Sequence, residues 1–222
     1  MALEAEIFPD PVTVAGRAAD YVVEHARSAI AERGVFTFAV SGGTTPWTMF
    51  GRLAGRLPWE NVAIYQVDER IAAAGDPDRN LTHLHASLPP AGVAVVHPMP
   101  VEADDLESAA AEYDASLPGA IDLVHLGLGP DGHTASLVPG DPVLDVSDRG
   151  VALTREYQGR RRMTLTYPTL DGARRILWLV TGDDKVEALR KLREGDPTIP
   201  GGRVARESAI LLADAAAAGE SR

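Results

Sequence analysis

The chain of 222 residues contains no cysteine, which excludes disulfide bonds, thiolate nucleophiles and cysteine metal sites. It also lacks an apolar run of membrane-spanning length and a basic-then-apolar leader, so we expect a cytoplasmic protein without a membrane partner. Positive charge is scarce, and the net charge of −11 argues against nucleic acid as a partner. Lysine occurs only at Lys185 and Lys191, so each lysine is a candidate for a specific role.

Strand-like apolar runs alternate with segments of helical periodicity along the whole chain. This alternation predicts an α/β fold, a three-layer sandwich with a mostly parallel sheet, and residues 1–222 are expected to form a single domain. The predicted helices cover residues 14–33, 46–57, 80–87, 103–116, 168–173 and 183–193. The predicted strands cover residues 35–40, 61–67, 93–96, 121–128, 151–154, 163–166, 176–181 and 209–212.

The segment HLGLGPDGHTASLVPG, residues 125–140, is the most informative part of the sequence, and it begins within the apolar run 121–128. Asp131 and His133 stand on a glycine-rich turn at the carboxyl end of that strand, and a short helix is expected from Thr134 onward. Gly132 between them permits backbone angles that other residues avoid. An acid and an imidazole at a strand end are typical of catalysis in open α/β sheets, so this turn is the predicted active site.

Three glycines in this turn also match the dinucleotide-binding pattern G-x-G-x-x-G. That pattern normally lies in the first strand–helix unit, whereas Gly127, Gly129 and Gly132 lie past the midpoint of the chain. Asp131 and His133 would stand where a pyrophosphate approaches, and the negative charge of Asp131 would repel the phosphates. We therefore expect no nucleotide, and a dehydrogenase remains an alternative that added NAD would reveal by raising the melting temperature.

The turn Ser41-Gly42-Gly43-Thr44-Thr45 is the second candidate site segment. It follows a predicted strand and precedes a helix, so its backbone N–H groups and the positive helix end can bind a phosphate or carboxylate. It lacks the lysine of a nucleotide-hydrolysing P-loop, and an ordinary strand-to-helix turn remains the alternative.

Three further segments carry charge where predicted strands end. Asp68-Glu69-Arg70 could orient a hydroxyl and bind an anion, although a solvated strand end remains open. Arg162 follows a hairpin turn, and strand alternation sends it to the face opposite Met163. Lys185 is expected in the first turn of a helix, where a cation is unfavourable unless an anion binds nearby.

Five motifs, in this order, resemble those of the 6-phosphogluconolactonases, members of the sugar-phosphate isomerase/deaminase superfamily. They are SGGTTP, VDER, GLGPDGHTASLVPG, RMTLTYPTL and TGDDK. The resemblance extends from about residue 11 to residue 217 and implies a modified Rossmann-like sandwich that binds no nucleotide. Glucosamine-6-phosphate deaminases are similar in the same loops but carry a glutamate where this chain has Val138.

The resemblance implies hydrolysis of 6-phospho-D-glucono-1,5-lactone, a sugar phosphate lactone, without metal or other cofactor. His133 would be the general base, Asp131 its partner, Arg70 the oxyanion-stabilising group and Asp68 a hydroxyl-orienting residue. The phosphate and outer contacts would involve Ser41, Gly42, Gly43, Thr44, Asn80, Arg162 and Lys185. A deaminase and a non-catalytic sugar-phosphate-binding protein remain alternatives, and a monomer is expected with an oligomer left open. The other histidines are expected to be structural, with His125 in the core.

Overall fold

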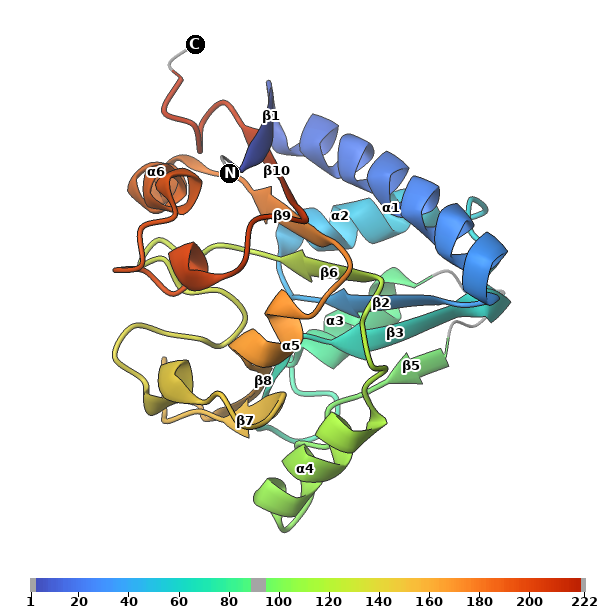
Figure 1. The fold of residues 1–222 in the computed structure, drawn as a ribbon, viewed down its shortest axis with the longest axis vertical. Helices are drawn as coiled ribbons and strands as arrows, with labels where there is room; N and C mark the ends of the chain where they lie inside the picture. Colours follow the sequence, from blue (N-terminus) through green and yellow to red (C-terminus); the bar gives the residue numbers. More distant parts are fainter. Residues whose placement is uncertain (1–2, 89–94, 221–222) are drawn as a thin grey trace.

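The computed structural model describes residues 3–88 and 95–220 and is built around a seven-stranded sheet (Figure 1). Its strands run in the order β1-β10-β9-β6-β2-β3-β5, and every neighbouring pair is parallel. Their bounds are β1 Glu4–Phe8, β2 Phe36–Val40, β3 Val62–Gln66, β5 Val95–His97, β6 Leu123–Leu126, β9 Ile176–Val180 and β10 Ala209–Asp214.

Helices cover both faces of this sheet and give the expected three layers. The α-helices are α1 Pro11–Arg33, α2 Thr44–Leu53, α3 Asn80–Ser87, α4 Leu106–Ser116, α5 Tyr167–Asp171 and α6 Val186–Glu194. One core cluster packs α1, α2 and α3 against the sheet, and a second packs α4, α5 and α6 on the other face. Figure 1 shows α1 and α2 together on one side and α4 on the opposite side. The predicted α/β sandwich is therefore confirmed.

Local sequence explains where these elements begin and end. Asp10 caps α1 by accepting a hydrogen bond from the Thr13 amide, and Pro11 follows in the first helical turn. Gly34 ends the helix with φ +77°, a left-handed conformation that glycine adopts without strain. The strand β2 is buried at every residue, as a central strand covered on both faces must be.

The strand order brings three predicted site segments to one edge. From β2 the chain continues through α2 to β3 on one side, whereas from β6 it continues to β9 on the other. Such a reversal of direction between adjacent strands opens a crevice at their carboxyl ends. The turns that follow β2, β6 and β9 carry Ser41, His133 and Lys185, and they meet there.

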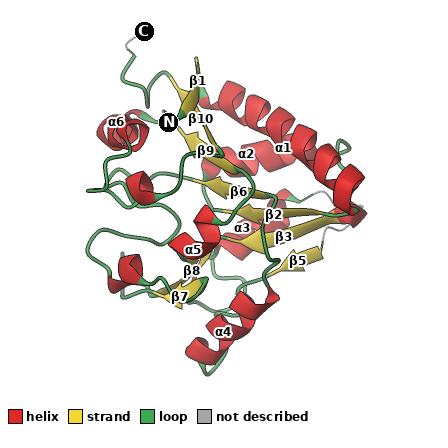
Figure 2. Cartoon of the chain, in the orientation of Figure 1, coloured by secondary structure: helices red, strands yellow, loops and turns green. Residues whose placement is uncertain are grey.

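A second, three-stranded antiparallel sheet in the order β4-β8-β7 completes this edge (Figure 2). It consists of β4 Asp68–Arg70, β7 Val151–Leu153 and β8 Arg162–Leu165. Asp68-Glu69-Arg70 is thus a strand of its own rather than the tip of the preceding strand. Arg70 lies directly opposite Arg162 in the ladder. Like charges in facing positions destabilise a sheet, which points to an anion between them.

Two sequence expectations need correction in the described part of the chain. The segment after Thr134 is not a helix: Thr134 bridges to Leu137, and Ala135 has φ +51°, which interrupts any helical run. Lys185 ends a short 3-10 helix and precedes α6 instead of lying in its first turn. The other 3-10 helices are Trp59–Asn61, Pro142–Asp145 and Gly201–Arg203. Strand β1 was not predicted, and the expected strand 93–96 begins outside the described residues.

Candidate active site

The pairing of His133 with Asp131 is the central feature of the site. The Nδ1 atom of His133 lies 2.5 Å from Oδ1 of Asp131, so the i and i+2 side chains meet directly. A carboxylate only accepts hydrogen bonds, so Nδ1 carries the proton and the lone pair is on Nε2. Gly132 makes this turn possible with φ +83°, and a Cβ there would lie 2.4 Å from Ile199.

The charge on Asp131 is stabilised in this position. Burial raises the pKa of Asp131, but the charge and hydrogen bonds of His133 and the hydroxyl of Tyr157 outweigh burial and lower that pKa below its ordinary value. Asp131 therefore remains an anion beside the imidazole at neutral pH and orients it. A carboxylate beside a catalytic histidine typically has this function.

Three cations face the same space as this pair. Arg162 is only 5% exposed, and its Nε atom has no hydrogen-bond partner in the described part of the chain. Burial lowers the pKa of Arg162, and the charge of Arg70 lowers it further. Lys185 lines the same cavity and pairs with Asp184 at 2.8 Å. A buried guanidinium with an unsatisfied donor beside a second arginine is a strong indication of an anionic ligand.

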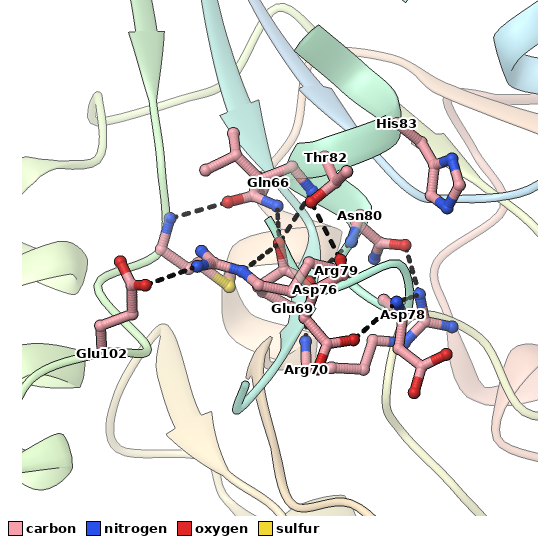
Figure 3. Close-up of polar contacts among 12 residues, drawn as sticks. Gln66, Glu69, Arg70, Asp76, Asp78, Arg79, Asn80, Thr82, His83 and Glu102 are labelled. Carbon is pink, nitrogen blue, oxygen red and sulfur yellow. Dashed lines mark hydrogen bonds and ion pairs between the residues drawn. The ribbon is translucent and has the colours of Figure 1, made fainter. Parts of the chain in front are cut away.

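A buried polar network holds Arg70 in place, as Figure 3 shows. Arg70 donates to the Oδ1 atom of Asn80 and to the carbonyl oxygen of Asp78. Asn80 in turn donates through Nδ2 to the backbone oxygen of Asp68. The fully buried carboxylate of Glu69 accepts from the backbone amides of Arg70 and Asn80, which ties the start of α3 to β4. With both ends of its amide engaged, Asn80 orients Arg70 and Asp68.

The turn Ser41-Gly42-Gly43-Thr44-Thr45 lies against this network. A Cβ on Gly42 would lie only 2.0 Å from Oδ1 of Asn80, so the chain approaches as closely as only glycine permits. The amide of Ser41 donates to Nδ1 of the fully buried His125, so that N–H is not available to a ligand. His125 is thus a core histidine, as expected, and burial lowers its pKa to about 3.

These residues line one cavity of about 220 Å³. The predicted residues on its wall are Ser41, Gly42, Gly43, Asp68, Arg70, Asn80, His133, Arg162 and Lys185. Thr44 and Asp131 lie outside the lining, and Asp131 forms a hydrogen bond with the lining residue His133. Three larger cavities, of about 410 to 530 Å³, contain none of the predicted residues, so volume alone would have pointed elsewhere.

Sequence reasoning missed two residues of the site. The hydroxyl of Ser136 donates to Oδ2 of Asp68 at 2.7 Å, and it lies within the motif that the sequence had singled out. Tyr157 donates to Oδ2 of Asp131 at 3.0 Å from a hairpin 26 residues away. The only sequence signal for Tyr157 was the turn-forming pair Gln158-Gly159 beside it.

Within residues 3–88 and 95–220, no cluster of three or more His, Asp or Glu side chains is arranged to hold a metal ion. No helix in those ranges is long and apolar enough to cross a membrane.

Fold and site together define a parallel α/β protein that can hold a small anionic molecule beside an oriented histidine. Residues 9–212 match the family described as Glucosamine-6-phosphate isomerases/6-phosphogluconolactonase, and the chain belongs to that family. The 6-phosphogluconolactonase of Synechocystis sp. (strain ATCC 27184 / PCC 6803 / Kazusa) is 37% identical over 216 residues, covering 89% of this chain and 88% of the relative. That of Mesorhizobium japonicum is 40% identical over 194 residues, covering 80% of each chain.

Solved structures share the fold. The 6-phosphogluconolactonase of Shewanella baltica OS155 superposes with a TM-score of 0.87 at 22% identity, covering 96% of this chain and 97% of the other. A monomeric glucosamine-6-phosphate deaminase superposes with a TM-score of 0.83 at 20% identity, covering 99% and 100%. Because both activities occur on this fold, the fold alone does not choose between them.

Proposed function

We propose that the chain is a 6-phosphogluconolactonase that hydrolyses 6-phospho-D-glucono-1,5-lactone to 6-phosphogluconate in the oxidative pentose phosphate pathway. The observation that carries the proposal is the meeting of the His133–Asp131 pair with Arg70, Arg162 and Lys185 around one small cavity. The base can activate water to attack an ester, and the clustered cations can bind the phosphate that the same molecule carries. The relatives that are 37% and 40% identical bear the same name, which supports this choice.

His133 acts as the general base in this proposal. Its Nε2 lone pair removes a proton from a water molecule, whose oxygen forms a bond to the lactone carbonyl carbon. Asp131 holds the Nδ1 proton and stabilises the imidazolium that results. When the tetrahedral intermediate collapses, the ring C–O bond breaks and the imidazolium returns its proton to the departing oxygen. One water is consumed and the histidine is regenerated.

Arg70 stabilises the negative charge that develops on the carbonyl oxygen. A well-placed donor of this kind typically contributes about 2.7–4 kcal/mol to catalysis. Its bond to Asn80 fixes the guanidinium before substrate arrives, so little reorganisation is needed during the reaction. Asp68, oriented by Ser136 and Asn80, is placed to accept a hydrogen bond from a sugar hydroxyl.

The phosphate is bound by other groups on the wall of the same cavity. Arg162 offers its unpaired Nε, Lys185 adds a second charge, and the turn at Gly42 and Gly43 leads into α2 with its positive end. Such binding energy, remote from the reacting carbon, positions the lactone next to His133.

A deaminase of amino sugars is the second candidate, because a deaminase has the same fold. The position where those enzymes carry a glutamate is Val138, which is only 5% exposed and packs in the core. An acid/base group is therefore absent from that position, which favours the lactonase.

The proposal also includes a single domain over residues 1–222 and a monomer that acts in the cytoplasm. Pairing of β1 with β10 joins the two ends of the chain in one sheet, and the family match over residues 9–212 supports one domain. Light scattering combined with gel filtration tests the monomer.

Turnover of freshly generated lactone is the decisive experiment. The purified protein should form 6-phosphogluconate well above the spontaneous rate, and it should release no ammonia from glucosamine 6-phosphate. Hydrolysis at the spontaneous rate, with 6-phosphogluconate bound, would instead favour the non-catalytic binding protein. Ammonia release would favour the deaminase.

A further inference from the structure

We propose that Tyr157 is a positioning residue that links the base His133 to the anion-binding Arg162. From the β7–β8 hairpin it contacts Asp131, the partner of His133, and Arg162 itself. This inference rests on the proposed function, because it assigns Tyr157 a part in the same reaction. No motif of the sequence analysis includes this residue, so it is absent from the predicted site.

The hydroxyl of Tyr157 completes the hydrogen bonding of Asp131. Oδ1 of Asp131 binds the His133 ring at 2.5 Å, and Oδ2 accepts from the Tyr157 hydroxyl at 3.0 Å. With both oxygens engaged, the carboxylate cannot rotate without breaking a charge-assisted hydrogen bond. The edge of one ring also meets the face of the other, with centroids 5.6 Å apart at 65°. The imidazole is thereby held from two directions.

The ring of Tyr157 serves Arg162. The guanidinium carbon of Arg162 lies 5.0 Å from the centre of the Tyr157 ring, within range of a cation–π interaction. Next to it, Gln158 accepts a hydrogen bond from Nη2 of Arg162 at 3.3 Å. These contacts hold the guanidinium while its Nε remains unpaired. One side chain therefore orients the base through its hydroxyl and the cation through its ring.

The hairpin is rigid enough for this role. Gln158 and Gly159 both have positive φ, +52° and +78°, as in the tight two-residue turns whose twist matches antiparallel strands. Tyr157 and Arg160 exchange backbone hydrogen bonds across the turn. Arg160 also forms ion pairs with Asp76 and Asp78 in the segment that leads to Asn80. The turn is therefore anchored to the elements that hold Arg70.

The Tyr157 phenol also stays protonated, as its hydrogen bond to Asp131 requires. Burial raises the pKa of Tyr157, and the hydrogen bond to Asp131 raises it further. Tyr157 thus remains a hydrogen-bond donor throughout the neutral range.

Two substitutions separate the two contacts. Tyr157→Phe removes the hydroxyl and keeps the ring, so we expect kcat to fall about tenfold with KM nearly unchanged, as for a loosened general base. Tyr157→Leu removes both, so KM should also rise by about three- to thirtyfold, the effect of losing a desolvated cation–π contact. Calorimetry should show a matching loss of 6-phosphogluconate affinity in the leucine variant only. Tyr21→Phe, on the distant helix α1, is the matched control and should behave as wild type.

The inference fails if Tyr157→Phe keeps the wild-type kcat. It also fails if the two variants show the same kcat and the same KM. Melting temperatures within about 2 °C of wild type, measured for all variants, exclude unfolding as the cause. The failure of the proposed function is a different result: the wild type itself would show no turnover. In that case the ¹⁵N shifts of His133 still test the inference, since Tyr157→Phe should weaken the preference for the Nδ1-protonated ring. Unchanged shifts would overturn it.

Discussion

Replacing Arg162 with methionine should leave the free protein about as stable as wild type, or more stable, while it destroys tight binding of the phosphate. Arg162 is 5% exposed and its Nε has no partner within the described residues. Burying an unsatisfied donor typically costs about 1–3 kcal/mol, which methionine would recover. The variant loses the contacts with Tyr157 and Gln158, together about 1–1.5 kcal/mol. The net change in the free energy of unfolding is about −0.5 to +2 kcal/mol.

Affinity for the phosphate-bearing ligand, unlike the stability of the free protein, should fall strongly. Loss of one partner from a buried, hydrogen-bonded charge pair costs about 2–5 kcal/mol, so KM should rise at least about thirtyfold. Thermal unfolding with and without 6-phosphogluconate measures both effects. At 100 times the wild-type Kd the ligand should add about 2.7 kcal/mol to the stability of the wild type, and at most about 0.9 kcal/mol to that of a variant that binds thirtyfold or more weakly.

Arg161→Met is the matched control for this experiment. Arg161 is the exposed neighbour of Arg162, and it lies outside the cavity lining. Its replacement removes the same charge and should leave the ligand-induced rise in melting temperature intact. A destabilised Arg162→Met protein that still responds fully to 6-phosphogluconate would refute the reasoning, because Arg162 would then be a structural cation.

Two further predictions concern His125 in the core and Gly42 on the wall of the cavity. Burial lowers the pKa of His125 to about 3 from 6.5, so unfolding takes up a proton between these values. Wild-type stability should therefore fall below about pH 6.5, by up to ~1.4 kcal/mol per pH unit, and acid titration of His125→Asn should show a shallower fall. Gly42→Ala places a methyl group 2.0 Å from Asn80 and should lower kcat at least about tenfold. Gly51→Ala, in open space on α2, is its control and should leave steady-state kinetics unchanged.

The layers and the crevice could be predicted because they depend on local patterns. Mostly apolar runs such as 36–40 and 176–180 identify buried parallel strands, and parallel strands bring their carboxyl-end turns together. That rule alone predicted that the turns after β2, β6 and β9 lie together at the site. By contrast, β1 alternates polar and apolar residues at the sheet edge, so its short run EAEIF gave a weak signal.

The errors came from contacts and backbone angles that the local sequence pattern does not reveal. Thr134 looked like a helix start, but its hydroxyl donates to the carbonyl of Gly127 and Ala135 takes a left-handed conformation. The triplet Asp68-Glu69-Arg70 became a strand because β8 pairs with it from nearly a hundred residues away. Tyr157 reaches Asp131 only because the hairpin folds over the site. Such pairings depend on tertiary geometry that no local pattern contains.

Turnover by His133→Ala tests the central claim most directly. With the imidazole removed, kcat above the spontaneous rate should fall by about 10²- to 10⁴-fold, the usual contribution of a general base. Affinity for 6-phosphogluconate should stay near the wild-type value, since Arg162 and Lys185 are untouched. Hydrolysis at the wild-type rate in this variant would contradict the account.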